Sequence, residues 1–424
     1  MRPGDTFSLH IEKPAAGGWM IARSQGQVIL VSGAIPGERA AVKVDRIGKG
    51  VAYGHAMTIE EPSADRRTPF VDLACGGCLY AHIENARQLE IKSQVIADAL
   101  ARIAHVTWPA PIAVAPSPDE GYRMRSRLHV RDRRIGFFRE GSHDLCDARA
   151  TRQLLPETAD VVEELARRLS GAGAVRGELE LSENIAATDR VVHFESAGPV
   201  DRRAWTDATR DLQLTGVALS DSHDVTGRTS LLRGDFHVTD VLPLRGYDVR
   251  LRRHVQAFFQ GNRFLLHDLV AHVIDQMDTG DDVIDLYAGA GVFSLSAAIV
   301  HGARVTAVEG DRFAAADLSA NVAETSGAIE AVHQSVEAFV SRHRAAPAVL
   351  IVDPPRTGMS KEALAGALQM GARSVLYVSC DVATLARDTR RFVDAGYELR
   401  GVTAFDLFPN TPHVETVVVL RRSG

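Results

Sequence analysis

The sequence predicts an α/β protein built in three parts: a small N-terminal β-barrel over residues 1–60, a central α+β domain, mostly β, over residues 61–250, and a C-terminal doubly wound α/β domain over residues 251–424. Two patterns carry this prediction. The first part holds short β-rich runs with Gly and Pro between them, at the roughly 8–12-residue spacing typical of small barrels. In the third part, apolar β-branched runs alternate with helix-compatible stretches, as in a parallel sheet covered on both faces.

The side-chain patterns of the first two parts predict where their strands and their helix lie. The expected barrel strands cover residues 6–11, 17–22, 27–31, 40–46 and 51–56. Between residues 84 and 104, apolar side chains recur mainly at spacings of three and four, which predicts an amphipathic helix. From Tyr122 to about Arg250 the chain is again strand-like.

The third part is expected to contain a buried parallel sheet. Its strands cover residues 283–288, 304–308, 348–352, 374–378 and 414–420. These runs are almost continuously apolar, which suits strands that are buried on both faces. In such a sheet, ligands bind at the edge formed by the carboxyl ends of the strands.

The overall composition is that of a globular protein, with 45% hydrophobic and 24% charged residues. The net charge of −6 argues against a histone-like partner of nucleic acid, because nonspecific affinity for nucleic acid comes from phosphate neutralisation. The N-terminus has no apolar signal region and no long apolar run occurs, so we expect no membrane association. The 4 cysteines are too few for a secreted disulfide framework, so we expect a cytoplasmic protein.

One basic segment departs from this acidic average. Residues 121–139 contain a single acid, Asp132, among seven arginines, at positions 123, 125, 127, 131, 133, 134 and 139. Such a segment is either a solvated strand face or a surface that binds a polyanion. The choice depends on whether another feature of the chain implies a polyanionic ligand.

A glycine-rich turn follows the first strand of the C-terminal part. Gly289 and Gly291 would let a ligand approach the backbone closely, although such turns also occur for helix and sheet packing alone. The third position of the dinucleotide fingerprint is Ser294, which disfavours a dinucleotide. Glu309 ends the next strand, where a carboxylate can accept hydrogen bonds from both ribose hydroxyls.

Two further polar residues are expected at the same sheet edge, and a third opens the last strand. Asp353 follows the strand at 348–352, and Cys380 closely follows the strand at 374–378. A lone cysteine is more often an inert core residue, but one at the mouth of a ligand crevice is placed to meet substrate. Glu415 opens the last apolar run, and a carboxylate that enters a buried strand needs a partner or a function.

These motifs together resemble the S-adenosylmethionine-dependent RNA 5-methyluridine methyltransferases. The resemblance rests on Asp285–Gly291, Phe258–Asn262, Asp353–Gly358, Tyr377–Asp381, Thr384–Asp388 and Asp406–Glu415, with Gly121–Arg123 in the central part. Residues 1–60, with Ala34–Glu38, are similar to the TRAM domain of the ribosomal-RNA branch, which the tRNA uridine-54 branch usually lacks. Asp381 and Asn410 stand where the family usually has Asn and Gln. The resemblance implies a class I methyltransferase domain with a Rossmann-like fold.

The resemblance also implies residue roles. S-adenosylmethionine would be held by Gln260, Tyr287, Glu309 and Asp353, over the Gly289 and Gly291 turn. Cys380 would be the nucleophile that adds to uracil C6, and Glu415 the base that removes the C5 proton. RNA would contact the basic segment through Arg123, Arg125, Arg127 and Arg131, and folded RNA would be gripped through its phosphates while the target base is splayed out.

A degenerate cysteine loop separates this chain from the relatives that carry an iron–sulfur cluster. Cys75 and Cys78 occupy two of the family's four ligand positions, but the other two fall at Pro69 and near Thr151. A [4Fe-4S] cluster therefore lacks two ligands. Cys146 and His143 offer an alternative Cys3His zinc set with Cys75 and Cys78. The other alternative is a loop that packs without metal.

The expected function is methylation of a uridine at C5 in RNA, with 23S ribosomal RNA as the expected substrate and a monomer as the expected state. Transfer RNA uridine-54 methylation and a noncatalytic RNA-binding or ribosome-assembly factor are the alternatives. The presence of both Cys380 and Glu415 argues against the noncatalytic factor. Ser379 disfavours a cytosine methyltransferase, since those enzymes typically have Pro before the thiol.

Overall fold

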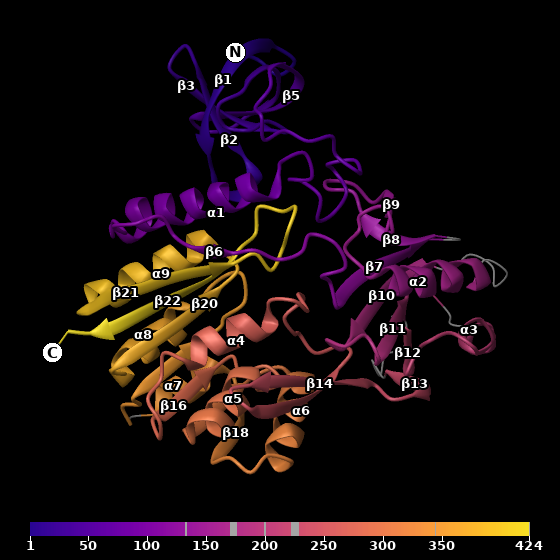
Figure 1. Cartoon of the computed structure of the whole chain (residues 1–424), viewed down its shortest axis with the longest axis vertical. Helices are drawn as coiled ribbons and strands as arrows, with labels where there is room; N and C mark the ends of the chain where they lie inside the picture. Colours follow the sequence, from indigo (N-terminus) through magenta and orange to yellow (C-terminus); the bar gives the residue numbers. More distant parts are fainter. Residues whose placement is uncertain (132–133, 170–175, 199–200, 222–228, 344, 424) are drawn as a thin grey trace.

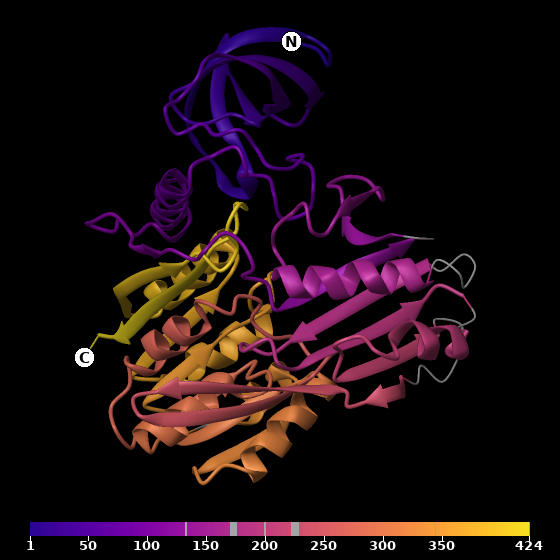
Figure 2. The ribbon, with the colours of Figure 1, turned by 45° about the vertical axis from the view of Figure 1, so that its right-hand side comes forward.

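The computed structural model describes residues 1–131, 134–169, 176–198, 201–221, 229–343 and 345–423 (Figure 1). The N-terminal part is a closed barrel with strand order β1-β2-β3-β5-β4. Its strands are β1 (Thr6–Pro14), β2 (Met20–Ser24), β3 (Gln27–Ser32), β4 (Arg39–Ile47) and β5 (Val51–Glu61). Alternate residues such as Leu9 and Ile11 fill its core while His10 between them faces solvent. The expected barrel is thus confirmed, and it lies at one end of the molecule (Figures 1 and 2).

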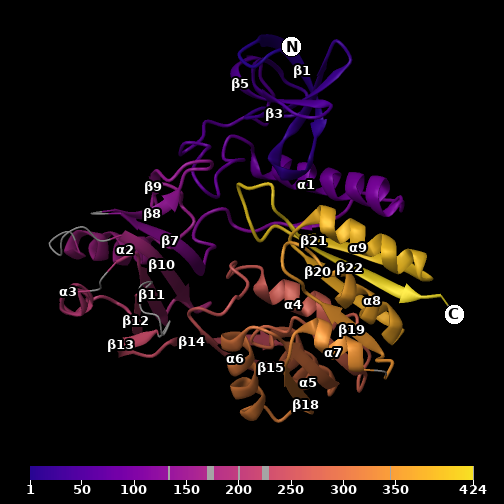
Figure 3. The ribbon, with the colours of Figure 1, turned by 180° about the vertical axis from the view of Figure 1, so that it is seen from behind.

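The helix expected at 84–104 is present as α1 (Asn85–Ala99), extended by a π-helical turn at Leu100–Ala104. It packs against α9 (Val382–Asp394), and Ile96 and Leu100 share a core with Leu350 of the C-terminal sheet. Figure 3 shows α1 next to α9. The short strand β6 (Val114–Ala115) then pairs with β21 (Tyr397–Phe405) at the edge of that sheet.

The central sheet has the strand order β13-β12-β11-β10-β7-β8-β9. Its strands are β7 (Arg125–Arg131), β8 (Arg134–Phe138), β9 (Leu145–Asp147), β10 (Arg176–Glu183), β11 (Arg190–Ser196), β12 (Gly216–Asp221) and β13 (Ser230–Gly234). Helices α2 (Pro156–Leu169) and α3 (Arg202–Thr209) complete the domain. Trp205 of α3 is buried and stacks on Phe194 of β11, with ring centroids 4.5 Å apart.

A hairpin of β14 (His237–Leu244) and β15 (Tyr247–His254) follows this sheet. Its apolar residues Leu242 and Leu251 lie in the same core as Leu269 and Phe293 of the C-terminal domain. The expected central range 61–250 is therefore divided: its first helix, β6 and this hairpin pack with the C-terminal sheet. The apolar faces of these elements find their partners there, and a boundary at 250 separates residues that share one core.

The C-terminal sheet has the order β18-β17-β16-β19-β20-β22-β21-β6. Its further elements are α4 (Leu266–Ile274), β16 (Asp282–Leu286), α5 (Val292–His301), β17 (Arg304–Glu309), α6 (Arg312–Ala323), β18 (Ile329–His333), α7 (Val336–Arg342), β19 (Val349–Val352), α8 (Lys361–Met370), β20 (Ser374–Ser379) and β22 (Glu415–Arg422). Val349 and Ile351 lie in one core and Leu350 and Val352 in another, so the sheet is covered on both faces, as expected. β22 runs antiparallel to β20.

Short polar side chains begin the helices that surround this sheet. Asp311, Ser335, Ser360 and Asp381 each accept a hydrogen bond from a backbone N–H in the first turn of α6, α7, α8 and α9. These caps fix where each strand-to-helix turn ends. Among the described residues, no helix combines the length and the apolar character needed to cross a membrane.

Candidate active site

The strand order brings the expected site residues to one edge of the C-terminal sheet. Strands β17, β16, β19 and β20 are parallel neighbours, so the residues at their carboxyl ends lie side by side. Glu309 ends β17, Tyr287 follows β16, Asp353 follows β19 and Cys380 follows β20. Because β22 is antiparallel, its first residue, Glu415, lies at this same edge.

The turn after β16 has left-handed backbone angles at two glycines and at one tyrosine. Tyr287, Gly289 and Gly291 have φ values of 65°, 58° and 97°, all in the left-handed region. A Cβ at Gly291 would lie 2.5 Å from Leu295 Cδ1, so this glycine serves helix packing. A Cβ at Gly289 would meet nothing within 4 Å, so there the turn faces open space in which a ligand can approach the backbone. The packing interpretation therefore accounts for only one of the two glycines.

Glu309 is tied to this turn by its carboxylate. Oε2 accepts a hydrogen bond from the backbone N–H of Gly289 at 2.8 Å, and Oε1 accepts one from the N–H of Asp311 at 2.6 Å. Each oxygen retains a lone pair for a further donor such as a hydroxyl. The side chain is thus held above the open face of the glycine turn.

Ser294 and Asp285 form a buried pair beneath the turn. The Ser294 hydroxyl donates a hydrogen bond to Asp285 Oδ2 at 2.5 Å, which gives the serine at the third fingerprint position a packing role. Asp285 Oδ1 is buried and has no hydrogen-bond partner among the described residues. Burial raises the pKa of Asp285 to about 7, and the nearby charge of Glu309 adds to this effect.

Gln260 and Asp353 form the next contact along the edge. Gln260 Nε2 donates to Asp353 Oδ2 at 3.2 Å. Burial and the charge of Asp285 raise the pKa of Asp353 to about 7, and the Gln260 hydrogen bond only partly opposes them. Asp285, Asp353 and Glu415 therefore bring carboxyl groups into one shielded region, which favours a ligand that carries positive charge.

Cys380 and Glu415 are brought together by strand pairing. Ser379 of β20 is paired with Thr416 of β22, so the next residue of one strand faces the preceding residue of the other. Burial raises the pKa of the Cys380 thiol to about 12, and the charge of Glu415 adds to this. Burial, and then the charge of Asp353, raise the pKa of Glu415 well above its usual range.

Arg356 is a site residue to which the sequence analysis gave no role. Its guanidinium lies near both groups and opposes the raised pKa values of Cys380 and Glu415. It is the cation placed to stabilise a Cys380 thiolate. Its position in the Asp353–Gly358 motif, three residues after an edge carboxylate, was the available signal.

The basic segment is less uniform than its sequence suggests. Arg123 donates to Gln153 Oε1 at 2.5 Å and Arg125 to the carbonyl of Ala257 at 3.0 Å, so both are used internally. Arg127 and Arg131 are exposed. The neighbouring strand β10 sets Glu180 opposite Arg127, with a hydrogen bond of 3.0 Å.

These cross-strand acids offset part of the positive charge that was counted along the chain. Glu178 also lies near Arg127, at 3.5 Å from its Nε atom. Asp132 and Arg133 lie outside the described residues. The described part of the segment therefore offers Arg127, Arg131 and Arg134 as its exposed cations.

The cysteine loop is closed by a disulfide between Cys75 and Cys146, and Cys78 is a buried free thiol. The Cys3His zinc alternative is therefore wrong for this structure, since two of its thiolates are bonded to each other. No metal-ligating cluster of His, Cys, Asp or Glu occurs in the described ranges. Thr151 is buried and its hydroxyl donates to the carbonyl of Ala148 at 2.7 Å, so it has a packing role. The residues present do not fit a four-cysteine cluster.

Two family models match the chain. The tRNA (Uracil-5-)-methyltransferase model covers residues 204–423 and the TRAM domain model covers residues 2–57. An uncharacterized RNA methyltransferase of Thermosynechococcus vestitus is 31% identical, over 99% of both chains. The 23S rRNA (uracil(1939)-C(5))-methyltransferase of Halomonas elongata is 31% identical, over 97% of this chain and 89% of its own.

A solved structure shares the whole fold. The tRNA (uracil-54, C5)-methyltransferase of Pyrococcus abyssi, in complex with S-adenosyl-L-homocysteine, covers 97% of this chain and 99% of its own, with a TM-score of 0.77 and 24% identity. The family models and the relatives thus define an RNA methyltransferase with an N-terminal TRAM barrel. The chain belongs to the RNA (uracil-5-)-methyltransferase family and carries a TRAM domain, which confirms the resemblance inferred from its motifs.

Proposed function

We propose that this enzyme transfers a methyl group from S-adenosylmethionine to C5 of a uridine in 23S ribosomal RNA, through a covalent adduct between Cys380 and uracil C6. The observation that carries the proposal is the pairing of a thiol and a buried carboxyl, Cys380 and Glu415, beside further carboxyl groups at the same sheet edge.

The residues of the crevice suit this methyl donor. Glu309 has oxygens free for ribose hydroxyls, and Gly289 leaves open space next to the backbone. Asp285 has an unpartnered buried oxygen, and Asp353 lies nearby with a raised pKa, so both groups would be stabilised by an ammonium or sulfonium. Tyr287 and Gln260 would complete the set. When bound there, S-adenosylmethionine supplies an electrophilic methyl group on a positively charged sulfur.

The side chains at the edge divide the chemistry between them. The Cys380 thiolate, stabilised by Arg356, adds to C6, and the electron pair of the C5–C6 bond moves onto the O4 enolate. C5 then becomes nucleophilic and takes the methyl group. Glu415 removes the C5 proton, and the electron pair of that C–H bond re-forms the C5–C6 bond and expels the thiolate.

The raised pKa of Glu415 suits the order of these steps. A cation in the crevice would hold the carboxyl ionised before methyl transfer, because an opposite charge favours the carboxylate. Once the positive charge on sulfur is lost, Glu415 returns to an environment that raises its pKa. The carboxylate is then a stronger base, at the step at which the C5 proton leaves.

The RNA class is proposed from the relatives named for 23S rRNA, because the N-terminal barrel is also covered by the structure named for tRNA uracil-54. The exposed arginines Arg127 and Arg131 would contact its phosphates, whereas Arg123 and Arg125 are held by internal hydrogen bonds. Methylation of RNA from a strain that lacks the gene tests this directly, with 5-methyluridine mapped in ribosomal and transfer RNA after reaction with the purified protein. We expect 5-methyluridine in 23S rRNA. Modification confined to transfer RNA would overturn the ribosomal assignment while it leaves the chemistry intact.

A further inference from the structure

We propose that the buried ion pair between Arg263 and Glu183 is a positioning device for the donor site: it fixes the segment 257–263 so that Gln260 meets Asp353. This proposal rests on the proposed function, in which these two residues hold the methyl donor. None of the side-chain hydrogen bonds that Arg263 and Glu183 make in the described structure goes to Gln260 or Asp353, so we expect any effect on the donor to pass through the segment.

The segment is bonded to the central domain at three points on its backbone. The Gly261 carbonyl accepts a hydrogen bond from the N–H of Met124 at 2.9 Å. The Arg263 N–H donates to the Tyr122 carbonyl at 2.9 Å, and the Ala257 carbonyl accepts from the Arg125 side chain at 3.0 Å. Gln260 thus lies in a short stretch whose two ends are bonded to Tyr122 and Arg125, at the start of the basic segment.

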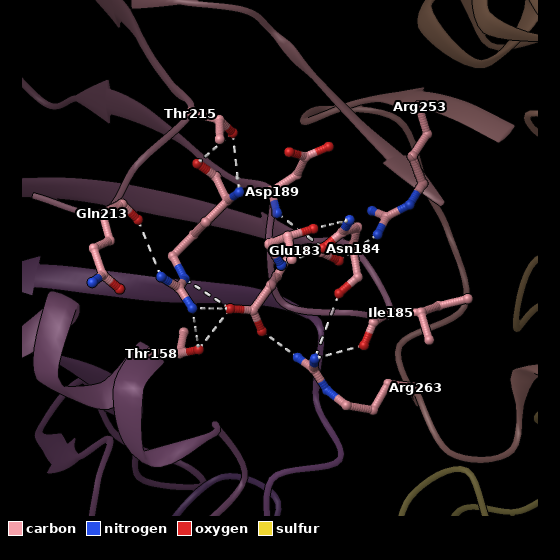
Figure 4. Close-up of polar contacts among 11 residues, drawn as sticks. Thr158, Glu183, Asn184, Ile185, Asp189, Gln213, Thr215, Arg253 and Arg263 are labelled. Atoms are coloured by element: carbon pink, nitrogen blue, oxygen red, sulfur yellow. Dashed lines mark hydrogen bonds and ion pairs between the residues drawn. The ribbon is translucent and has the colours of Figure 1, made fainter. Parts of the chain in front are cut away.

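The side chain of Arg263 also bonds this stretch to the central domain. Figure 4 shows its guanidinium aimed at the carboxylate of Glu183, and the pair is in direct contact. A second nitrogen of Arg263 donates to the Ile185 carbonyl at 3.1 Å. Glu183 is itself fixed by Thr158, whose hydroxyl donates to it at 2.7 Å, and by Arg190, whose Nε donates at 2.7 Å.

The Arg263–Glu183 pair is buried, so its hydrogen bonds hold the two side chains in one relative position. The side chains of Arg263 and Glu183 are 4% and 0% exposed. A buried ion pair adds less stability than a well-packed apolar pair of the same size, but it fixes the relative position of its partners through directional bonds. The hydrogen bond from Gln260 to Asp353 is sensitive to displacements well below an ångström. We therefore expect the Arg263–Glu183 ion pair, three residues away along the chain, to set the geometry of this bond.

Arg190 provides a matched control. It contacts the same carboxylate and its side chain is 3% exposed, but it belongs to β11. Its other side-chain bonds go to the Gln213 carbonyl and to the Thr158 hydroxyl. Loss of Arg190 should therefore disturb the buried charges of the cluster while the backbone bonds of segment 257–263 remain.

The test compares Arg263→Gln and Arg190→Gln in the full chain by thermal melting and by calorimetric binding of S-adenosylhomocysteine. Both variants should melt at lower temperature than wild type. Only Arg263→Gln should raise the dissociation constant, by about tenfold, a change of about 1.4 kcal/mol. Arg263→Lys keeps the charge and should recover part of the affinity. It also serves as the test if the glutamine variant fails to fold.

A double-mutant cycle separates positioning from general destabilisation. In a Gln260→Ala background, Arg263→Gln should cause no further loss of affinity, because the side chain that it positions is gone. Additive losses, an unchanged dissociation constant in Arg263→Gln, or equal losses in the two arginine variants would overturn the proposal. A wild-type protein that binds no S-adenosylhomocysteine would instead overturn the proposed donor site, and this inference with it.

Discussion

Glu309 accepts a hydrogen bond at 2.8 Å from the backbone N–H of Gly289, which joins the end of β17 to the turn after β16. This contact orients the carboxylate before any ligand arrives. It also satisfies a backbone donor in a turn that has no room for a larger residue at Gly291.

The first prediction concerns this carboxylate. Glu309→Ala removes an acceptor for the ribose hydroxyls and should weaken binding of S-adenosylmethionine by about 1–3 kcal/mol. Isothermal calorimetry measures the loss. Glu330→Ala, at an exposed position of the adjacent strand β18, is the control and should bind as wild type does. An unchanged affinity in a folded Glu309→Ala protein would mean that the ribose lies elsewhere.

The second prediction is that alanine substitutions at the two glycines of the turn affect stability and donor binding differently. Gly291→Ala forces a Cβ against Leu295 and Leu318, so it should cost more than about 2 kcal/mol of stability. Gly289→Ala meets open space and should cost only about 1 kcal/mol for its left-handed backbone, but the methyl group should obstruct the donor. Thermal melting and donor affinity, measured on both variants, check this. Equal effects of the two substitutions on both quantities would contradict the distinction.

The third prediction concerns the pH dependence of methylation. Arg356 lowers the pKa of the Cys380 thiol, so Arg356→Gln should raise that pKa further and reduce the thiolate fraction at neutral pH. The rising limb of the rate against pH should move upward by about one unit. Steady-state rates across the pH range measure the shift. Arg390→Gln, at a half-buried arginine of α9 that pairs with Asp394 of the same helix, should leave the profile in place. An unshifted profile for Arg356→Gln would remove the arginine from this role.

The fourth prediction concerns the cysteine loop. Purified protein should contain no stoichiometric iron or acid-labile sulfide, because Pro69 and Thr151 supply no thiolate ligands. Anaerobic purification followed by iron and sulfide analysis tests this. Stoichiometric iron with a visible charge-transfer band would show that Cys146, or a partner chain, completes a site.

The sequence could place these candidate site residues because each ends or follows a recognisable strand. Glu309, Asp353 and Cys380 could be assigned to one edge before their contacts were known, since parallel strands place their carboxyl ends together. Arg356 was overlooked because its role depends on a contact with Cys380 across a turn, which no local pattern reveals.

The domain boundaries and the basic patch were harder to predict for the same physical reason: both depend on partners distant in sequence. Lys92 of α1 is buried against Asp406, which lies 314 residues later. The sequence around the helix therefore does not indicate which domain it packs against. The amphipathic pattern predicts a buried face but not the surface that buries it. Likewise, Glu180 reduces the charge of the basic strand through a pairing that arises only in the folded sheet.

The central claim is that Cys380 forms a covalent bond to RNA that Glu415 later releases. Cys380→Ala should abolish methylation, since no adduct can form. Glu415→Gln leaves addition and methyl transfer open but removes the base for the C5 proton.

The most direct measurement is denaturing gel electrophoresis of Glu415→Gln after incubation with S-adenosylmethionine and an RNA that wild type methylates. A protein–RNA band that carries the methyl label and is lost in the Cys380→Ala, Glu415→Gln double variant is the predicted result. Wild type should give a similar stable band with 5-fluorouridine at the target, because fluorine cannot leave as a proton does. If neither trap appears on RNA that wild type demonstrably methylates, the assignment of nucleophile and base is contradicted.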